Sequence, residues 1–198
     1  HPFVVPGDPS AENFKIDNLA PSEALVDRLD DRVALLDKFD TWRRRADKAG
    51  SMDALDEFNR RALELVTSEK ARKAFDLTQE PEAVRERYGK HAYGQRALMA
   101  RRLVEAGVTF VTMVMENPQL PGGLPNYVSY NWDSHAVNCH LFKDAEVRFP
   151  RYDQAVTALI EDLYQRGLDR RVLLVVTGEF GRTPRVSYSV GTSSGIMQ

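Results

Sequence analysis

Two strongly apolar runs, separated by one long amphipathic segment, constrain the fold of this chain more than any other feature. Residues 108–115 read VTFVTMVM and residues 172–177 read VLLVVT, so both runs are rich in β-branched and other apolar side chains. Such runs are typical of strands buried on both faces of a parallel sheet. Residues 145–166, between them, carry apolar side chains at helical spacing. The order strand, helix, strand favours a right-handed crossover, so we predict an α/β fold in which helices cover part of a parallel sheet.

The rest of the sequence divides into regions of different character. Residues 1–21 are rich in Pro, Asn and Asp and are interpreted as a loop with a possible edge strand at PFVV. Residues 22–76 contain helical apolar patterns and are interpreted as a helical cap or insertion, and residues 77–198 form the predicted α/β half-domain. Two or three strands are too few for a parallel sheet. We therefore expect further strands outside this sequence, which is interpreted as an internal piece of a longer protein.

Charge and composition argue against several classes of function. The 198 residues include 27 Lys and Arg against 29 Asp and Glu, a formal net charge of −2, which gives no electrostatic basis for binding nucleic acid. No apolar run approaches the roughly 18–20 residues that a membrane span requires. The single cysteine, Cys139, excludes an internal disulfide framework. The composition is that of an ordinary globular protein, and it leaves the oligomeric state open.

Three potential metal ligands follow the two apolar runs. Asp133 and His135 lie in the long loop at residues 116–144, and Glu179 comes shortly after the run at residues 172–177. Because ligands bind beyond the carboxyl ends of parallel strands, we expect these side chains to meet at one edge of the sheet. Two carboxylates and an imidazole suit Zn²⁺, Mn²⁺ or a similar divalent ion. The alternatives are an Asx-turn with a surface histidine for the first pair, and a structural ion pair for Glu179.

Other polar residues near these runs have more than one interpretation. Arg182 presents a guanidinium fork suited to an oxyanion and is the candidate catalytic residue, but it could instead cap the preceding turn or pair with Glu179. His140 is a weaker candidate ligand, because a lone histidine beside Cys139 is common by chance. The segment YGKHAYGQ, at residues 88–95, predicts a helix break packed against the sheet.

Several stretches of the sequence resemble one bacterial family. FDLTQEPEAVRERYG, ARRLVEAGVTFVTM, NWDSHAVNCH and GEFGRTP are similar to the family filed as domain of unknown function 1501, and the similarity extends along essentially the whole sequence. That family is placed with the alkaline-phosphatase-like superfamily, whose sites hold one or two divalent metals at the carboxyl edge of a parallel sheet. The resemblance implies that Asp133 and His135 belong to one metal-binding loop. It also implies that Glu179 replaces the aspartate of an Asp-His pair, while Phe180 stands where the histidine would be.

The resemblance implies a metal-dependent hydrolase of phosphate or sulfate esters. Its substrate would be a small anionic ester, its cofactor a divalent metal ion (Zn, Mn, Ca or Mg), and its nucleophile is expected outside this sequence. Because members of the family typically carry an export signal, the parent protein is expected to be periplasmic or otherwise extracytoplasmic. The alternative is an exported, non-catalytic protein on the same fold, in which a metal stabilises a binding or structural role, and Phe180 favours this alternative.

Overall fold

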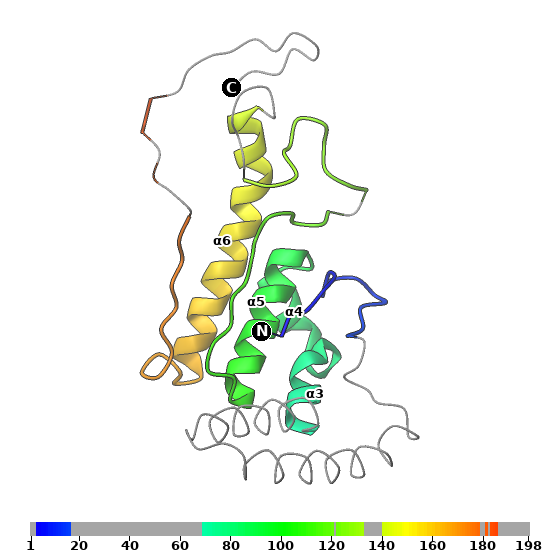
Figure 1. Ribbon diagram of the computed structural model, residues 1–198, viewed down its shortest axis with the longest axis vertical. Helices are drawn as coiled ribbons and strands as arrows, with labels where there is room; N and C mark the ends of the chain where they lie inside the picture. The colour runs from blue at the N-terminus through cyan, green and yellow to red at the C-terminus, as the bar shows by residue number, and fades with distance from the viewer. Residues whose placement is uncertain are drawn as a thin grey trace, which may run out of the picture. The chain divides into compact units, whose positions relative to one another are not determined.

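The computed structural model describes residues 3–16, 69–120, 122–132, 140–178, 181 and 183–185. All regular structure in these residues is helical (Figure 1). The chain divides into two compact units, residues 1–6 with 15–76 and residues 7–14 with 77–198. The first unit contains helix α3 (Glu69–Phe75), and the ring centroids of Phe75 and Phe3 lie 5.9 Å apart. The rest of the predicted helical cap, residues 22–68, lies outside the described residues.

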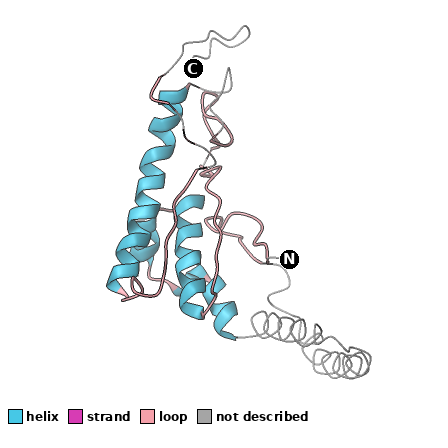
Figure 2. Cartoon of the chain, turned by 60° about the vertical axis from the view of Figure 1, so that its left-hand side comes forward, coloured by secondary structure: helices cyan, strands magenta, loops and turns pink. Residues whose placement is uncertain are grey.

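Three α-helices form the described core of the second unit. The unit contains the 3₁₀ turn η1 (Leu77–Gln79) and the helices α4 (Glu82–Tyr88), α5 (Ala92–Ala106) and α6 (Leu141–Gln165). Helix α5 packs against α6, and α4 packs against both (Figure 2). Apolar side chains of all three helices are buried, including Tyr88, Tyr93, Leu98, Ala155, Leu159 and Leu163. This core supports the loop that leads toward Asp133.

The helix ends follow from local sequence. Helix α4 begins after Pro81, whose missing N–H would have no partner at a helix start. Helix α5 ends at Gly107, which has a left-handed φ of 105° that favours glycine. Helix α6 begins at Leu141, before the predicted start at residue 145, because His140 caps it. Pro150 lies inside α6 and removes one main-chain donor without ending the helix.

The predicted α/β fold is wrong for the part of the chain that the structure describes, because that part contains no strand. Residues 108–115 and 172–177 run as loop, and so do residues 3–5, the described part of the possible edge strand PFVV (Figure 2). Phe110 is 84% exposed and Leu173 is 86% exposed, whereas strands covered on both faces would bury them. Apolar composition reports a preference for burial. A strand also needs a second segment to share its backbone hydrogen bonds, and an apolar run does not specify that partner.

Helix α6 has the length of a membrane span but not its composition. Its 25 residues include the charged stretch KDAEVR in the first two turns. Across the described ranges, no helix is both long enough and apolar enough to cross a membrane.

Candidate functional site

The predicted site residues lie outside the described residues; they are Asp133, His135, Glu179 and Arg182, and Cys139 and Phe180 lie outside them as well. The structure therefore neither brings them together nor separates them. Among the residues that it does describe, no group of three or more His, Cys, Asp and Glu side chains could hold a metal ion. The structure does show how the chain on both sides of residues 133–139 is attached to the helices.

A buried arginine, Arg148 of α6, attaches the preceding loop to the helical core. Its side chain is 0% exposed, and its Nε atom donates to both carboxylate oxygens of Asp144, at 3.0 and 2.9 Å. Its Nη1 atom donates to the hydroxyl oxygen of Tyr93 at 3.1 Å and to the backbone carbonyl of Glu116. Its Nη2 atom donates to the backbone carbonyl of Ser129. We call Tyr93, Asp144, Arg148 and the carbonyls of Glu116 and Ser129 the Arg148 clamp.

The members of the Arg148 clamp satisfy one another's hydrogen-bonding groups. Asp144 is 4% exposed, and it also accepts a hydrogen bond from the backbone N–H of Ser129 at 3.0 Å. Burial raises the pKa of the Tyr93 hydroxyl, which stays protonated and donates to the carbonyl of Glu116 at 2.8 Å. An unpaired buried charge would cost several kcal/mol. Here the two opposite charges are paired, so the clamp can hold Ser129 by both its N–H and its C=O.

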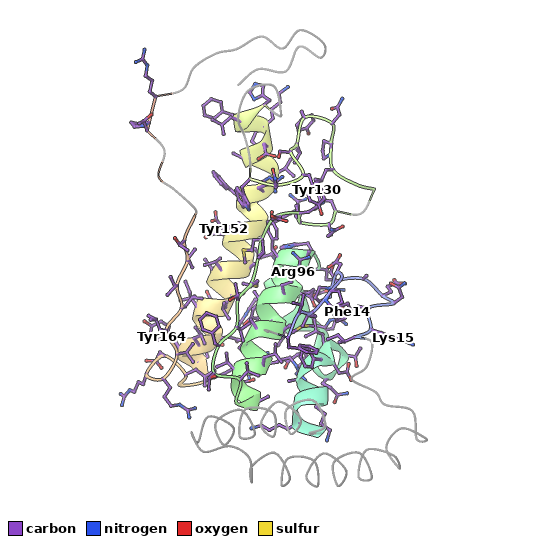
Figure 3. All side chains as sticks on the ribbon, viewed as in Figure 1. Phe14, Lys15, Arg96, Tyr130, Tyr152 and Tyr164 are labelled. Atoms are coloured by element: carbon purple, nitrogen blue, oxygen red, sulfur yellow. The ribbon has the colours of Figure 1, made fainter. Side chains whose placement is uncertain are left out.

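An aromatic cluster covers the clamp and holds Trp132, the last described residue before the predicted metal-binding loop. The indole ring stacks at 5.9 Å from Phe149 and at 6.4 Å from Tyr93, and it meets Tyr152 edge-on at 5.9 Å. Figure 3 labels Tyr152 on α6 and Tyr130 on the loop in this part of the molecule. Aromatic pairs of this kind contribute about 0.5–1.5 kcal/mol beyond the area they bury.

Two polar contacts restrain the same indole ring. The guanidinium carbon of Arg148 lies 5.2 Å from the ring centroid of Trp132, and such a cation–π contact is worth about 0.5–2 kcal/mol. The indole N–H donates to the backbone carbonyl of Met115. The residue immediately before Asp133 is therefore fixed by aromatic, cationic and hydrogen-bonding contacts.

His140, the first described residue after the predicted loop, is attached to the same helix. It is the N-cap of α6, and its Nδ1 atom accepts a hydrogen bond from the backbone N–H of Lys143 at 3.4 Å. Its own backbone N–H donates to the carbonyl of Tyr127 at 3.4 Å. The Nδ1 atom is thus used for capping, and a role as metal ligand would depend on Nε2 alone. Both sides of residues 133–139 are attached at the first turns of α6.

The helix break predicted at residues 88–95 is confirmed, but it packs against α6 rather than against a sheet. His91 caps α5 by accepting the backbone N–H of Gly94 at 3.2 Å, and its Nε2 atom lies 3.4 Å from Oε1 of Gln154 in α6. Burial lowers the pKa of His91. The side-chain amide of Gln95 donates to two backbone carbonyls near the end of α4, including that of Gly89 at 2.8 Å. These residues therefore join the helices and have no contact that indicates catalysis.

A second buried arginine, Arg101 of α5, is the centre of an ion-pair network. Its side chain is 1% exposed and pairs with Glu80 at 2.9 Å, Glu105 at 2.7 Å and Asp162 at 3.3 Å. Burial alone would raise the pKa of Glu80, but hydrogen bonds from Arg101 and a neighbouring arginine lower it. Burial and the charge of Asp162 raise the pKa of Tyr88, whose hydroxyl donates to Asp162 at 2.9 Å. This network joins α4, α5 and α6 to the residue that follows η1.

Neither buried arginine was singled out from the sequence. Charged residues are rarely buried unless they are paired. The available signal was the spacing, since Asp144 and Arg148 are four residues apart, as are Arg101 and Glu105, and each pair forms an ion pair on its own helix.

Within the described residues, these features define a helical scaffold whose longest helix anchors a loop through a buried aspartate and arginine. A family model described as protein of unknown function (DUF1501) matches residues 3–193 of the chain. The chain therefore belongs to this family. No curated protein and no solved structure matches it.

Proposed function

We propose that this protein is a metal-dependent hydrolase that acts on small phosphate or sulfate esters. Asp133, His135 and Glu179 would hold a divalent ion, and Arg182 would bind the anionic group of the substrate. The likeness of NWDSHAVNCH and GEFGRTP to metal-binding segments of phosphatases and sulfatases supports this proposal. Membership of a family does not by itself determine chemistry, so the types of donor atoms carry more weight here.

The donor set fits a divalent metal ion. Two carboxylates and an imidazole suit Zn²⁺ or Mn²⁺, whereas Ca²⁺ and Mg²⁺ prefer oxygen ligands throughout. When bound, such an ion supplies positive charge that polarises an ester oxygen. Arg182 has a planar fork of N–H donors, and this fork matches two oxygens of a phosphate or sulfate group. It would orient the ester and offset negative charge as the bond breaks.

The observation that best supports the proposal is the Arg148 clamp. A metal site requires ligands held within about 0.5 Å of their binding geometry. An ordinary surface loop has no such requirement. Here the clamp and the aromatic cluster hold Ser129 and Trp132, which precede Asp133 in the chain. A metal-binding loop needs the backbone that leads to its ligands to be held in this way.

A second candidate function is favoured by one residue, Phe180. In the resemblance, this position belongs to a histidine that completes an Asp-His pair, and phenylalanine cannot bind a metal. The protein would then keep a metal for stability and act as an exported binding or structural protein. In both cases we propose an extracytoplasmic location for this protein.

Metal content of the full-length protein and its Glu179→Gln variant tests the proposal. The protein would be equilibrated with Zn²⁺ or Mn²⁺, desalted and analysed by inductively coupled plasma mass spectrometry. Loss of a direct ligand should reduce affinity at least tenfold, because even residues that only orient ligands change it by about 10–100-fold. Glu161→Gln is the matched control, since Glu161 is exposed on α6. Equal metal content in both variants would remove Glu179 from the site.

Hydrolysis separates the two candidate functions. The metal-loaded protein would be assayed with an aryl phosphate and an aryl sulfate. Turnover of either ester that disappears with Arg182→Ala, at unchanged metal content, is expected for the hydrolase. Bound metal without turnover of either ester would support the non-catalytic alternative.

A further inference from the structure

We infer that Arg148 is a positioning residue for metal binding: it fixes the path of the loop that leads to Asp133 and His135. This inference rests on the proposed function. It concerns residues that touch neither metal nor substrate, and the contacts that carry it all lie in the described part of the chain.

One guanidinium group holds both ends of the loop at residues 116–129. The carbonyls of Glu116 and Ser129, which are 13 positions apart in the chain, both accept hydrogen bonds from Arg148. Tyr93 of α5 supports the first of these points by donating to the same Glu116 carbonyl at 2.8 Å. Asp144 supports the second by accepting the Ser129 N–H at 3.0 Å. The start and the end of this loop are therefore held at one buried group on α6.

The contacts of Arg148 require an arginine side chain, and another cation would not make them. Nε and both Nη atoms are used in different directions, and the planar group also lies over the ring of Trp132 at 5.2 Å. Lysine is a compact charge on a flexible stem and cannot reproduce this fork or stack in the same way. An Arg148→Lys substitution would keep the positive charge beside Asp144 but release at least one end of the loop.

Arg101 is a matched control for Arg148, because it is equally buried but does not hold the loop. Arg101 is 1% exposed, compared with 0% for Arg148, and it also pairs with carboxylates. The carboxylates in its ion pairs lie directly after η1, on α5 and on α6, and none of them lies in the described loop at residues 116–120 and 122–132. Arg101→Lys therefore makes the same chemical change at the same depth but should leave the loop in place.

The experiment is a titration of the full-length protein with Zn²⁺ and Mn²⁺ by isothermal calorimetry, combined with hydrogen exchange of peptides covering residues 127–132. Arg148→Lys should weaken metal binding by about 10–100-fold, the usual effect of residues that orient ligands. It should also accelerate exchange at the Ser129 amide. Arg101→Lys should lower the melting temperature while leaving metal affinity and exchange in this segment unchanged. Tyr93→Phe, which removes one hydroxyl from the clamp, should weaken metal binding by a smaller factor and serves if Arg148→Lys does not fold.

The outcomes separate the inference from the function on which it depends. If the unmodified protein binds neither metal, the proposed function fails and the inference fails with it. If the unmodified protein binds metal but Arg148→Lys or Tyr93→Phe binds it equally well, the inference alone is overturned. Equal losses of affinity in Arg148→Lys and Arg101→Lys would also overturn it, because the effect would then come from general destabilisation.

Discussion

Gly94 lies where the first turn of helix α5 packs tightly against the end of α4, and Gly94→Ala tests that packing directly. A Cβ atom built at this position would lie well inside 3.0 Å of the backbone carbonyl oxygens of Tyr88 and Gly89, a separation that real Cβ atoms essentially never show. Both atoms belong to the backbone rather than to flexible side chains. Relief therefore requires the first turn of α5 to move away from the end of α4.

The size of the effect can be worked from the contacts that would be lost. Overpacking costs about 1–3 kcal/mol, and rigid backbone neighbours favour the upper end of that range. Displacement of α5 would also break the two hydrogen bonds from Gln95 to Arg85 and Gly89, at about 1 kcal/mol each. Alanine regains about 1 kcal/mol through its higher helix propensity. We expect a net loss of about 4 kcal/mol in the free energy of unfolding, a large part of the total for a domain.

Urea denaturation followed by circular dichroism measures this loss, with Gly107→Ala as the matched control at the other end of α5. Gly107 has a φ of 105° and no heavy atom within 4 Å of a built Cβ, so alanine there meets only backbone strain of about 1–2 kcal/mol. We expect Gly94→Ala to be clearly the more damaging substitution. If it cost no more than Gly107→Ala, the close approach of α5 to α4 would be wrong.

Two further predictions concern the buried polar groups. Arg101→Met should cost about 3 kcal/mol, because it removes the buried positive charge that Glu80 and Asp162 share, whereas Arg166→Met, at a side chain 37% exposed, should cost less than about 1 kcal/mol; equal costs in urea denaturation would contradict the network. Burial lowers the pKa of His91 below its usual 6.5, although Gln154 and Asp8 have smaller effects that raise it. The stability that neutral His91 contributes is therefore present above pH 6.5, and it is lost as the pH falls toward the pKa of His91 in the folded protein. His91→Asn keeps a capping oxygen without titrating, so its stability deficit relative to the unmodified protein should shrink or reverse between pH 7.5 and 5.5, and a deficit independent of pH would refute this role.

The helices were the predictable part of the fold, because their signals are local. Apolar spacing indicated α6, Pro81 directly precedes α4, and Gly107 directly follows α5. The strands were not predictable in the same way, because residues 108–115 and 172–177 carry no information about which segment would pair with them. For the described residues, reading burial from composition gave the wrong secondary structure.

The candidate metal ligands could be proposed from the chemistry of their side chains, but the Arg148 clamp could not be predicted from the sequence. Asp133, His135 and Glu179 stand out as donor types near apolar runs, and they lie outside the described residues. The Arg148 clamp depends on tertiary contacts, such as that between Arg148 and the Ser129 carbonyl, across a separation in the chain that no local pattern encodes.

Apolar spacing in helix α6 predicts the helix but does not by itself identify its buried face. The helix buries Asp144 and Arg148, while Phe149 is 52% exposed and Ile160 is 40% exposed. The packing of this helix depends on which polar groups meet as well as on the apolar area that is buried. An arrangement that left a buried charge without its partner would cost free energy. The two ends of α6 use the same device for different purposes: Asp162 joins the Arg101 network in the helical core, and Arg148 holds a loop. Because the two arginines are alike in burial and differ in what they hold, exchanging each for lysine separates the contribution to folding from the contribution to the site.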